Sequence, residues 1–387
     1  MEEHEKLLQS PYKYITEEWA EASLPKVGKK TFDIVCLMPC GMILPEIPIG
    51  SKTISPRINV FECSASGTGK SSKADKFEKI AYFPLKRRDI SGRELQQKTI
   101  EMEMMTLIIE DFTQFIGGAD GYEKVKVLEG LIGEEANIGM SNMRVEILGQ
   151  AHACSLIMGT PLDLERYAKN IEGGLLSRCV LNIIYLSPEE HNFIGHYINS
   201  YAGDKEYAEK MQLKENEVIK FYKNLKRIQA GEDENISAVV SYKIDKKFKD
   251  DVYLKWSKLS EKLIQDLGEK SYIRDLNYYY RFLVCSAFLN ILNRKIEEVE
   301  IGRDSETGKI IKGSILHPNE EDHKLAIKLM IQNMKSKWAL AKAMWYKRNI
   351  HTFEMFKKIL ENEKSSEIKN ILMYISPHAK LVRDSVI

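Results

Sequence analysis

The sequence predicts an α/β protein in which a parallel sheet lies between two layers of helices and is followed by a helical domain. A glycine-rich loop, Cys63-Ser64-Ala65-Ser66-Gly67-Thr68-Gly69-Lys70-Ser71-Ser72, separates an apolar strand from a helix. Short apolar strands alternate with helical stretches from residue 57 to about residue 186, which is the pattern of a parallel sheet. Beyond residue 188 the chain becomes helical and rich in Lys and Tyr, and this shift marks a second domain.

Five apolar runs supply the strands of the sheet. We expect them at residues 57–63, near 80–84, and at 105–110, 152–159 and 180–186. The first strand precedes the glycine loop, and the residues that follow Ser72 have the pattern of a helix. Strand, loop and helix in this order are the context that a phosphate-binding loop requires.

The length and composition restrict the class of protein. The chain has 387 residues, of which 43% are hydrophobic and 29% are charged, and its net charge is +1. These values indicate a soluble globular protein of two or three domains, without an overall basic field that would attract nucleic acid. Six cysteines lie mostly in apolar runs, no apolar run reaches transmembrane length, and the N-terminus is acidic. We therefore expect a cytoplasmic protein that has no membrane partner.

The glycine loop is suited to nucleotide phosphates. Backbone N–H groups of such a loop converge on the β- and γ-phosphates, the lysine reaches the same oxygens, and the next hydroxyl ligates Mg²⁺. Ser64 stands where the usual pattern has its first glycine. The expected nucleotide-binding residues are Ser66, Gly67, Thr68, Gly69, Lys70, Ser71 and Ser72. The loop thus predicts an ATPase that uses ATP and Mg²⁺, and a Gly/Ser-rich surface turn is the alternative.

Two acids follow the third strand. The apolar run Met105-Thr106-Leu107-Ile108-Ile109 ends in Glu110-Asp111, and a strand that delivers acids to the carboxyl edge of the sheet is what a Walker B element does. By position Glu110 would join Ser71 in binding Mg²⁺, and Asp111 would polarise the attacking water. The usual order is Asp then Glu, so the division of roles stays open. A solvated acidic strand end is the alternative.

Two further polar residues lie next to the fourth and fifth strands. Thr160 follows the strand at 152–159 and is placed to orient the lytic water, although Gly-Thr-Pro is also an ordinary turn. Arg178 immediately precedes the last strand, away from Lys70 of its own chain. Such an arginine can act as an arginine finger on the nucleotide of a neighbouring subunit. The alternative is a surface arginine that caps the preceding helix.

These segments resemble the AAA+ ATPase module of minichromosome maintenance (MCM) type replicative helicases and of related plasmid and phage replication proteins. Leu175-Leu176-Ser177-Arg178 is similar to the finger segment of that family, and the run from Ala151 to Pro161 is similar to its sensor-1 strand. The pattern Arg274-Asp275-Leu276, with Arg281 five residues after the leucine, resembles the family's lid, which makes Arg274 the candidate sensor-2 arginine. An insertion from residue 296 to 314 carries a hairpin turn at 305–309.

The resemblance also implies a domain order and a role on DNA. It divides the chain into a helical lead-in (1–50), an AAA+ P-loop ATPase core (51–200), a helical lid domain (201–335) and a helical tail (336–387). The family's pre-sensor-1 hairpin carries a basic tip to DNA, and here Arg144 is the basic residue at that tip, with an ordinary surface hairpin as the alternative.

The function that the resemblance implies is that of a ring motor. A homo-oligomeric ring, a hexamer, would couple ATP hydrolysis to movement on single-stranded or forked DNA, as a helicase or translocase in replication of a mobile element or virus. Two alternatives keep the nucleotide site. One is an AAA+ protein remodeller or defence-system ATPase, and the other is a nucleotide-gated scaffold without efficient turnover.

Overall fold

The structure is a computed structural model. It describes residues 3–65, 67–87, 90–102, 104–117, 121–132, 137–140, 147–150, 152–161, 163, 174–201, 203–267, 273–303, 305 and 307–379.

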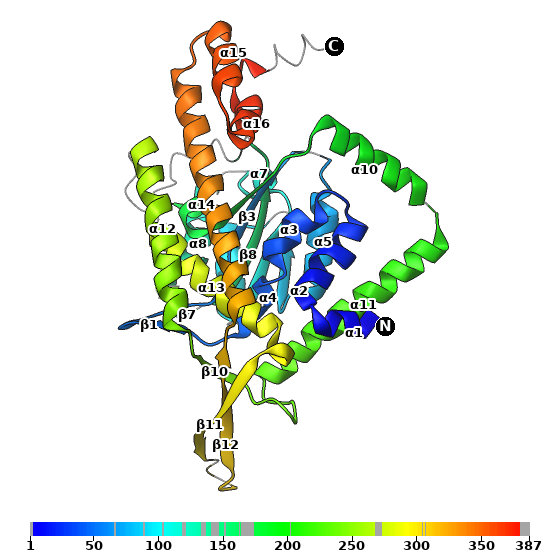
Figure 1. Ribbon diagram of the computed structural model, residues 1–387, viewed down its shortest axis with the longest axis vertical. Helices are drawn as coiled ribbons and strands as arrows, with labels where there is room; N and C mark the ends of the chain where they lie inside the picture. Colours follow the sequence, from blue (N-terminus) through cyan, green and yellow to red (C-terminus); the bar gives the residue numbers. More distant parts are fainter. Residues whose placement is uncertain are drawn as a thin grey trace.

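A five-stranded parallel sheet forms the centre of the described part of the molecule, with strand order β4-β5-β8-β3-β9 (Figure 1). Its members are β3 (Val60–Ser64), β4 (Pro84–Arg87), β5 (Met104–Ile109), β8 (His152–Gly159) and β9 (Val180–Ile184). β8 lies between β3 and β5, and Cys63 pairs with Gly159 while Ser64 pairs with Ile184. The α/β class and the parallel sheet are therefore confirmed, and the carboxyl ends of three neighbouring strands lie level with one another.

The second strand lies at 84–87, not near 80–84 as the sequence suggested. Helix α5 (Lys70–Ile80) occupies the start of the predicted strand, because Ala74, Phe77 and Ile80 fall on one side of it and are buried in the core. A short apolar run at the end of a helix resembles the start of a strand, since both are apolar.

One face of the sheet is covered by α5 and by the N-terminal helices, which share one apolar core with it (Figure 1). These are α1 (Glu3–Gln9), α2 (Pro11–Lys13), the π-helix η1 (Tyr14–Glu21), α3 (Gly28–Val35) and α4 (Met38–Ile43), followed by the hairpin of β1 (Ile47–Ile49) and β2 (Lys52–Ile54). Trp19 and Phe32 are fully buried and meet edge to face with ring centroids 5.2 Å apart. The N-terminal segment is thus an integral layer of the sheet domain.

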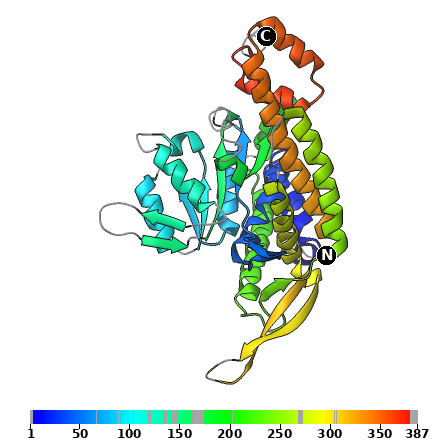
Figure 2. The ribbon, with the colours of Figure 1, turned by 90° about the vertical axis from the view of Figure 1, so that its left-hand side faces the viewer.

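The other face of the sheet has its own core, to which α6 (Gly92–Glu101), α7 (Phe112–Phe115) and α8 (Gly121–Leu131) contribute. The long helix α14 (Glu320–Asn349) packs residues into both cores, and α15 (Phe353–Asn362) and α16 (Ser366–Ile375) pack with its second half (Figure 2). A small hairpin of β6 (Asn137–Met140) and β7 (Ile147–Gln150) lies on the α8 side. α14 is continuous across residue 335, where the sequence suggested the start of a tail.

The chain after β9 is mainly helical, with α10 (Pro188–Tyr201), α11 (Lys205–Gln229), α12 (Lys246–Leu267) and α13 (Ile273–Leu289). Short 3-10 helices, η3 (Leu175–Arg178) and η4 (Ile291–Asn293), precede β9 and follow α13. β10 (Val239–Tyr242), β11 (Lys295–Arg303) and β12 (Ile310–His317) form a second sheet, and β11 and β12 extend as an arm away from the C-terminal helices (Figures 1 and 2). The hairpin predicted around 305–309 is confirmed.

Among the helices that the structure describes, none combines the length and the apolar character needed to span a membrane.

Candidate nucleotide site

The glycine loop joins the carboxyl end of β3 to the first residue of α5. Gly67 and Gly69 have φ angles of 80° and 70°, in the left-handed region that favours glycine. Thr68 is buried, and its hydroxyl oxygen lies within hydrogen-bond distance of Ser64 Oγ and of the Ala65 carbonyl, 2.9 Å from each. Two positive φ angles and the inward Thr68 close the loop over the end of the strand. Ser66 lies outside the described residues.

Lys70 stands at the start of α5, and its Nζ donates to the Ser64 carbonyl over 3.2 Å. The ammonium thus lies against the mouth of its own loop, where a lysine can meet phosphate oxygens. Ser71 and Ser72 are exposed on the first turn, and Gly69 supplies no side chain to cap the helix. The first N–H groups of an α-helix that lack a capping side chain, together with its dipole, favour an anion.

Glu110 lies at the carboxyl end of β5 and is 4% exposed. Lys86 of the neighbouring strand β4 forms an ion pair with it over 2.7 Å, and the same ammonium contacts Asp75 and Glu78 on α5. Partial burial is the largest single effect and acts to lower the pKa of Lys86, but the hydrogen bonds and the charges of Asp75 and Glu110 together outweigh it and raise that pKa, so Lys86 is charged. The expected metal carboxylate therefore already has a cation beside it.

Asp111 is exposed and caps α7, because its side chain accepts a hydrogen bond from the Gln114 N–H over 3.1 Å. The sequence placed this residue beside the lytic water. In the structure the described contact of its carboxylate is that of an N-cap, which stabilises a helix start.

Thr160 follows β8 and contacts a residue that sequence reasoning missed. Asp163 is 1% exposed, and one of its oxygens accepts from the Thr160 N–H over 2.7 Å and from the Thr160 hydroxyl over 2.9 Å. Its other oxygen accepts from the Thr113 hydroxyl over 2.7 Å. Asp163 thereby joins the loop after β8 to α7, which follows the acidic pair. An Asp four residues after the expected end of the strand at 152–159 was the available signal.

A second missed cluster lies under the loop. Glu62 in β3 and Lys73 in α5 form an ion pair over 2.5 Å, and both side chains are fully buried. Glu62 also accepts from the Thr31 hydroxyl of α3 over 2.7 Å, and lies 3.5 Å from the Asn182 amide of β9. The pair thus ties the N-terminal layer to the strand and helix that flank the glycine loop. The sequence feature that could have revealed this pair is Glu62, an acid in an otherwise apolar strand.

Arg178 and Arg274 lie together, at the opposite edge of the sheet from Lys70. Arg178 precedes the amino end of β9 and donates to the Glu129 carbonyl over 2.7 Å. Arg274 donates to the hydroxyl of Ser177, the neighbour of Arg178, over 2.7 Å. β9 runs parallel to β3 from Val180 to Ile184, and a strand of that length separates its two ends by about 13 Å. Neither arginine therefore lies at the carboxyl ends of the strands, where the glycine loop lies.

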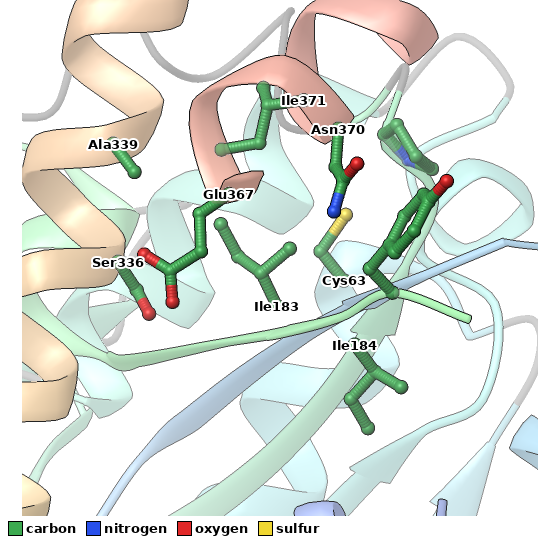
Figure 3. A pocket seen from close by; sticks show the side chains of 10 residues that line it. Cys63, Ile183, Ile184, Ser336, Ala339, Glu367, Asn370 and Ile371 are labelled. Carbon is green, nitrogen blue, oxygen red and sulfur yellow. The ribbon is translucent and has the colours of Figure 1, made fainter. Parts of the chain in front are cut away.

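A pocket with about 510 Å³ of empty space, part of it open solvent, lies beside the loop strand (Figure 3). Cys63 and Ile183 line it from the ends of β3 and β9, and Ser336 and Glu367 line it from α14 and α16. Burial, with the nearby Asp163 carboxylate, raises the pKa of the Cys63 thiol, so the thiol is protonated at neutral pH. The C-terminal helices thus form one wall next to the candidate site.

Arg144, the expected DNA contact, lies outside the described residues. Within the described ranges no group of three or more His, Cys, Asp or Glu side chains could hold a metal ion. Mg²⁺ at phosphate sites is bound through one or two carboxylates together with substrate phosphates and water, so the chemistry of Ser71 and Glu110 fits such an ion.

A scan against protein-family models finds no match to this chain, and a search of curated proteins finds no relative.

Proposed function

We propose that this protein is an ATPase that binds the phosphates of ATP on its glycine loop, assembles into a ring, and moves DNA during replication of a mobile element or virus. The observation that carries the proposal is the loop itself. Between a buried parallel strand and the uncapped start of α5, two glycines adopt positive φ and Lys70 lies at the mouth. A glycine loop that leads into an uncapped helix start is suited to phosphate.

Mg²⁺ would accompany the nucleotide and neutralise charge that develops on the phosphates. The Ser71 hydroxyl and the Glu110 carboxylate are oxygen donors of the kind that Mg²⁺ takes, and phosphate oxygens and water would complete its shell. Lys86 forms an ion pair with Glu110 and would compete with Mg²⁺ for that carboxylate. In this proposal Glu110 changes partner when ATP and the metal bind.

The position of Arg178 supports a ring. Arg178 and Arg274 lie next to each other at the amino edge of the sheet, whereas Lys70 lies at the carboxyl edge. Within one chain the two arginines are at the wrong edge for the phosphates. In a head-to-tail ring each subunit would offer this edge to the loop of the next, which makes Arg178 the arginine finger and Arg274 a second trans group.

DNA as the track rests on the resemblance to replicative helicases. The hairpin of β6 and β7 occurs where that resemblance expects the DNA-contacting hairpin. In the proposal the hairpin enters the channel of the ring and grips the phosphate backbone of single-stranded or forked DNA.

Steady-state phosphate release, with and without single-stranded DNA, tests the proposal. We expect turnover that requires Mg²⁺, rises with DNA, and is lost in Lys70→Ala. Lys79→Ala on the same helix is the matched control, because Lys79 pairs with Glu215 away from the loop. Absence of turnover would favour the nucleotide-gated scaffold. Turnover that DNA does not change, with no displacement of a forked strand, would favour a protein remodeller.

A further inference from the structure

The buried carboxylate of Asp163 is held entirely by uncharged donors in its described contacts. One oxygen accepts from the Thr160 N–H and hydroxyl, and the other accepts from the Thr113 hydroxyl. Burial of a carboxylate is costly, and three short hydrogen bonds offset part of this cost. Such an arrangement also holds the donor groups in place, because a donor that turned away would leave the buried carboxylate without one of its hydrogen bonds.

Asp163 lies at the junction of three strands of the candidate site. A Cβ added to Gly159, the last residue of β8, would lie 3.3 Å from Asp163 Oδ2 and 2.9 Å from the Phe61 ring of β3. Thr113 belongs to α7, which begins directly after the acidic pair of β5. One side chain therefore connects the ends of β5 and β8 next to the glycine-loop strand.

The direction of the hydrogen bond between Thr160 and Asp163 has a chemical consequence. A threonine hydroxyl carries one proton and two lone pairs, and the Thr160 hydroxyl donates to Asp163. The Thr160 proton is therefore used by Asp163, and the Thr160 oxygen can only accept from any third group. A water that donates to this oxygen turns a lone pair of its own away from Thr160.

We propose that Asp163 is a positioning residue of the ATPase reaction: it holds the Thr160 hydroxyl as a hydrogen-bond acceptor for the lytic water. The inference rests on the proposed function and adds to it a residue that the nucleotide-site motifs do not contain. It also gives a reason for the position of Thr113, which anchors the second oxygen of the carboxylate.

A double-mutant cycle on ATP turnover tests the inference. In Asp163→Ala the Thr160 hydroxyl can rotate, and we expect kcat to fall about tenfold or more while the KM for ATP changes less than about twofold. Thr160→Ala should lose kcat to a similar extent. Because Asp163 acts through Thr160, the double variant should be no slower than Thr160→Ala alone. A loss in the double variant equal to the product of the two single losses overturns the inference.

Two conservative variants separate positioning from structural support and guard against a misfolded alanine variant. Asp163→Asn has nearly the same shape and keeps an oxygen that accepts from Thr160, so kcat should stay within about threefold of the original protein. A loss in Asp163→Asn as large as in Thr160→Ala would show that the charge itself is needed, and would overturn the inference. Thr113→Val removes the bond to the other oxygen and should lower kcat less than about threefold. If the original protein does not turn over ATP, the proposed function fails first, whereas additive variants of an active enzyme refute only this role of Asp163.

Discussion

Glu62 and Lys73 show how single residues support the glycine loop. Both are fully buried, and Lys73 lies three residues beyond Lys70 on α5. A buried ion pair gains little net stability over apolar replacements, but removing one partner leaves an uncompensated charge. The Thr31 hydroxyl adds a bond to Glu62 from the N-terminal layer. The pair therefore fixes the first turn of α5 with respect to β3.

Lys73→Met should lower the free energy of unfolding by about 3–5 kcal/mol, because Glu62 then stays buried without its cation. The double variant Glu62→Gln with Lys73→Met should recover most of this loss. Urea unfolding monitored by circular dichroism measures both. Equal instability of the single and the double variant would mean that the charge of Glu62 is not what destabilises the protein.

The ion pair between Lys86 and Glu110 leads to a prediction about the Mg²⁺ requirement of ATP turnover. If Glu110 binds Mg²⁺, then Lys86→Met removes its competitor, and the Mg²⁺ concentration for half-maximal ATP turnover should fall about fivefold, as expected for loss of an ion pair worth about 1 kcal/mol. A titration of phosphate release against Mg²⁺ measures the change. An unaltered Mg²⁺ requirement in an active Lys86→Met enzyme would assign the metal to another group.

At the scale of elements, the loop and the strand ends decide the site. Gly69 sits between the loop and α5 with φ at 70°, and a side chain there would be strained whatever the space around it. Gly69→Ala should cost about 1–2 kcal/mol of stability and weaken ATP binding at least tenfold, because the loop must leave its phosphate-binding shape. Thermal unfolding and binding of a fluorescent ATP analogue measure the two effects.

Gly203→Ala is the matched control for this substitution. Gly203 also has a positive φ, 83°, and lies between α10 and α11. Gly203→Ala should lower the stability by a similar amount and leave ATP binding intact. If Gly69→Ala and Gly203→Ala bound ATP equally well, the conformation of the glycine loop would not be what recognises the nucleotide.

Local patterns predicted the elements that carry the motifs. The glycine loop, Lys70, and the strands before Glu110 and Thr160 follow from residues adjacent in the chain, and the sheet brings those strand ends level. Asp163 and the Glu62–Lys73 pair escaped prediction because their roles depend on distant partners. Thr113 lies 50 residues from Asp163, and Thr31 lies 31 residues from Glu62. A short sequence motif cannot predict contacts between residues that lie so far apart in the chain.

At the scale of the whole molecule, the two halves of the proposed catalytic machinery lie on opposite edges of one sheet. Lys70 and Ser71 begin α5 after the carboxyl end of β3, and Arg178 precedes the amino end of β9 beside Arg274. In a head-to-tail ring these edges meet between subunits. The central claim is that one subunit's loop and another subunit's Arg178 form each active site.

ATP turnover by a one-to-one mixture of Lys70→Ala and Arg178→Ala tests this claim most directly. Each variant alone should be inactive, since every interface then lacks either the lysine or the arginine. In a randomly mixed ring about one interface in four joins an intact loop to an intact Arg178, so turnover should return to about a quarter of the original rate. An inactive mixture, or an Arg178→Ala variant that turns over at full rate alone, would contradict the claim.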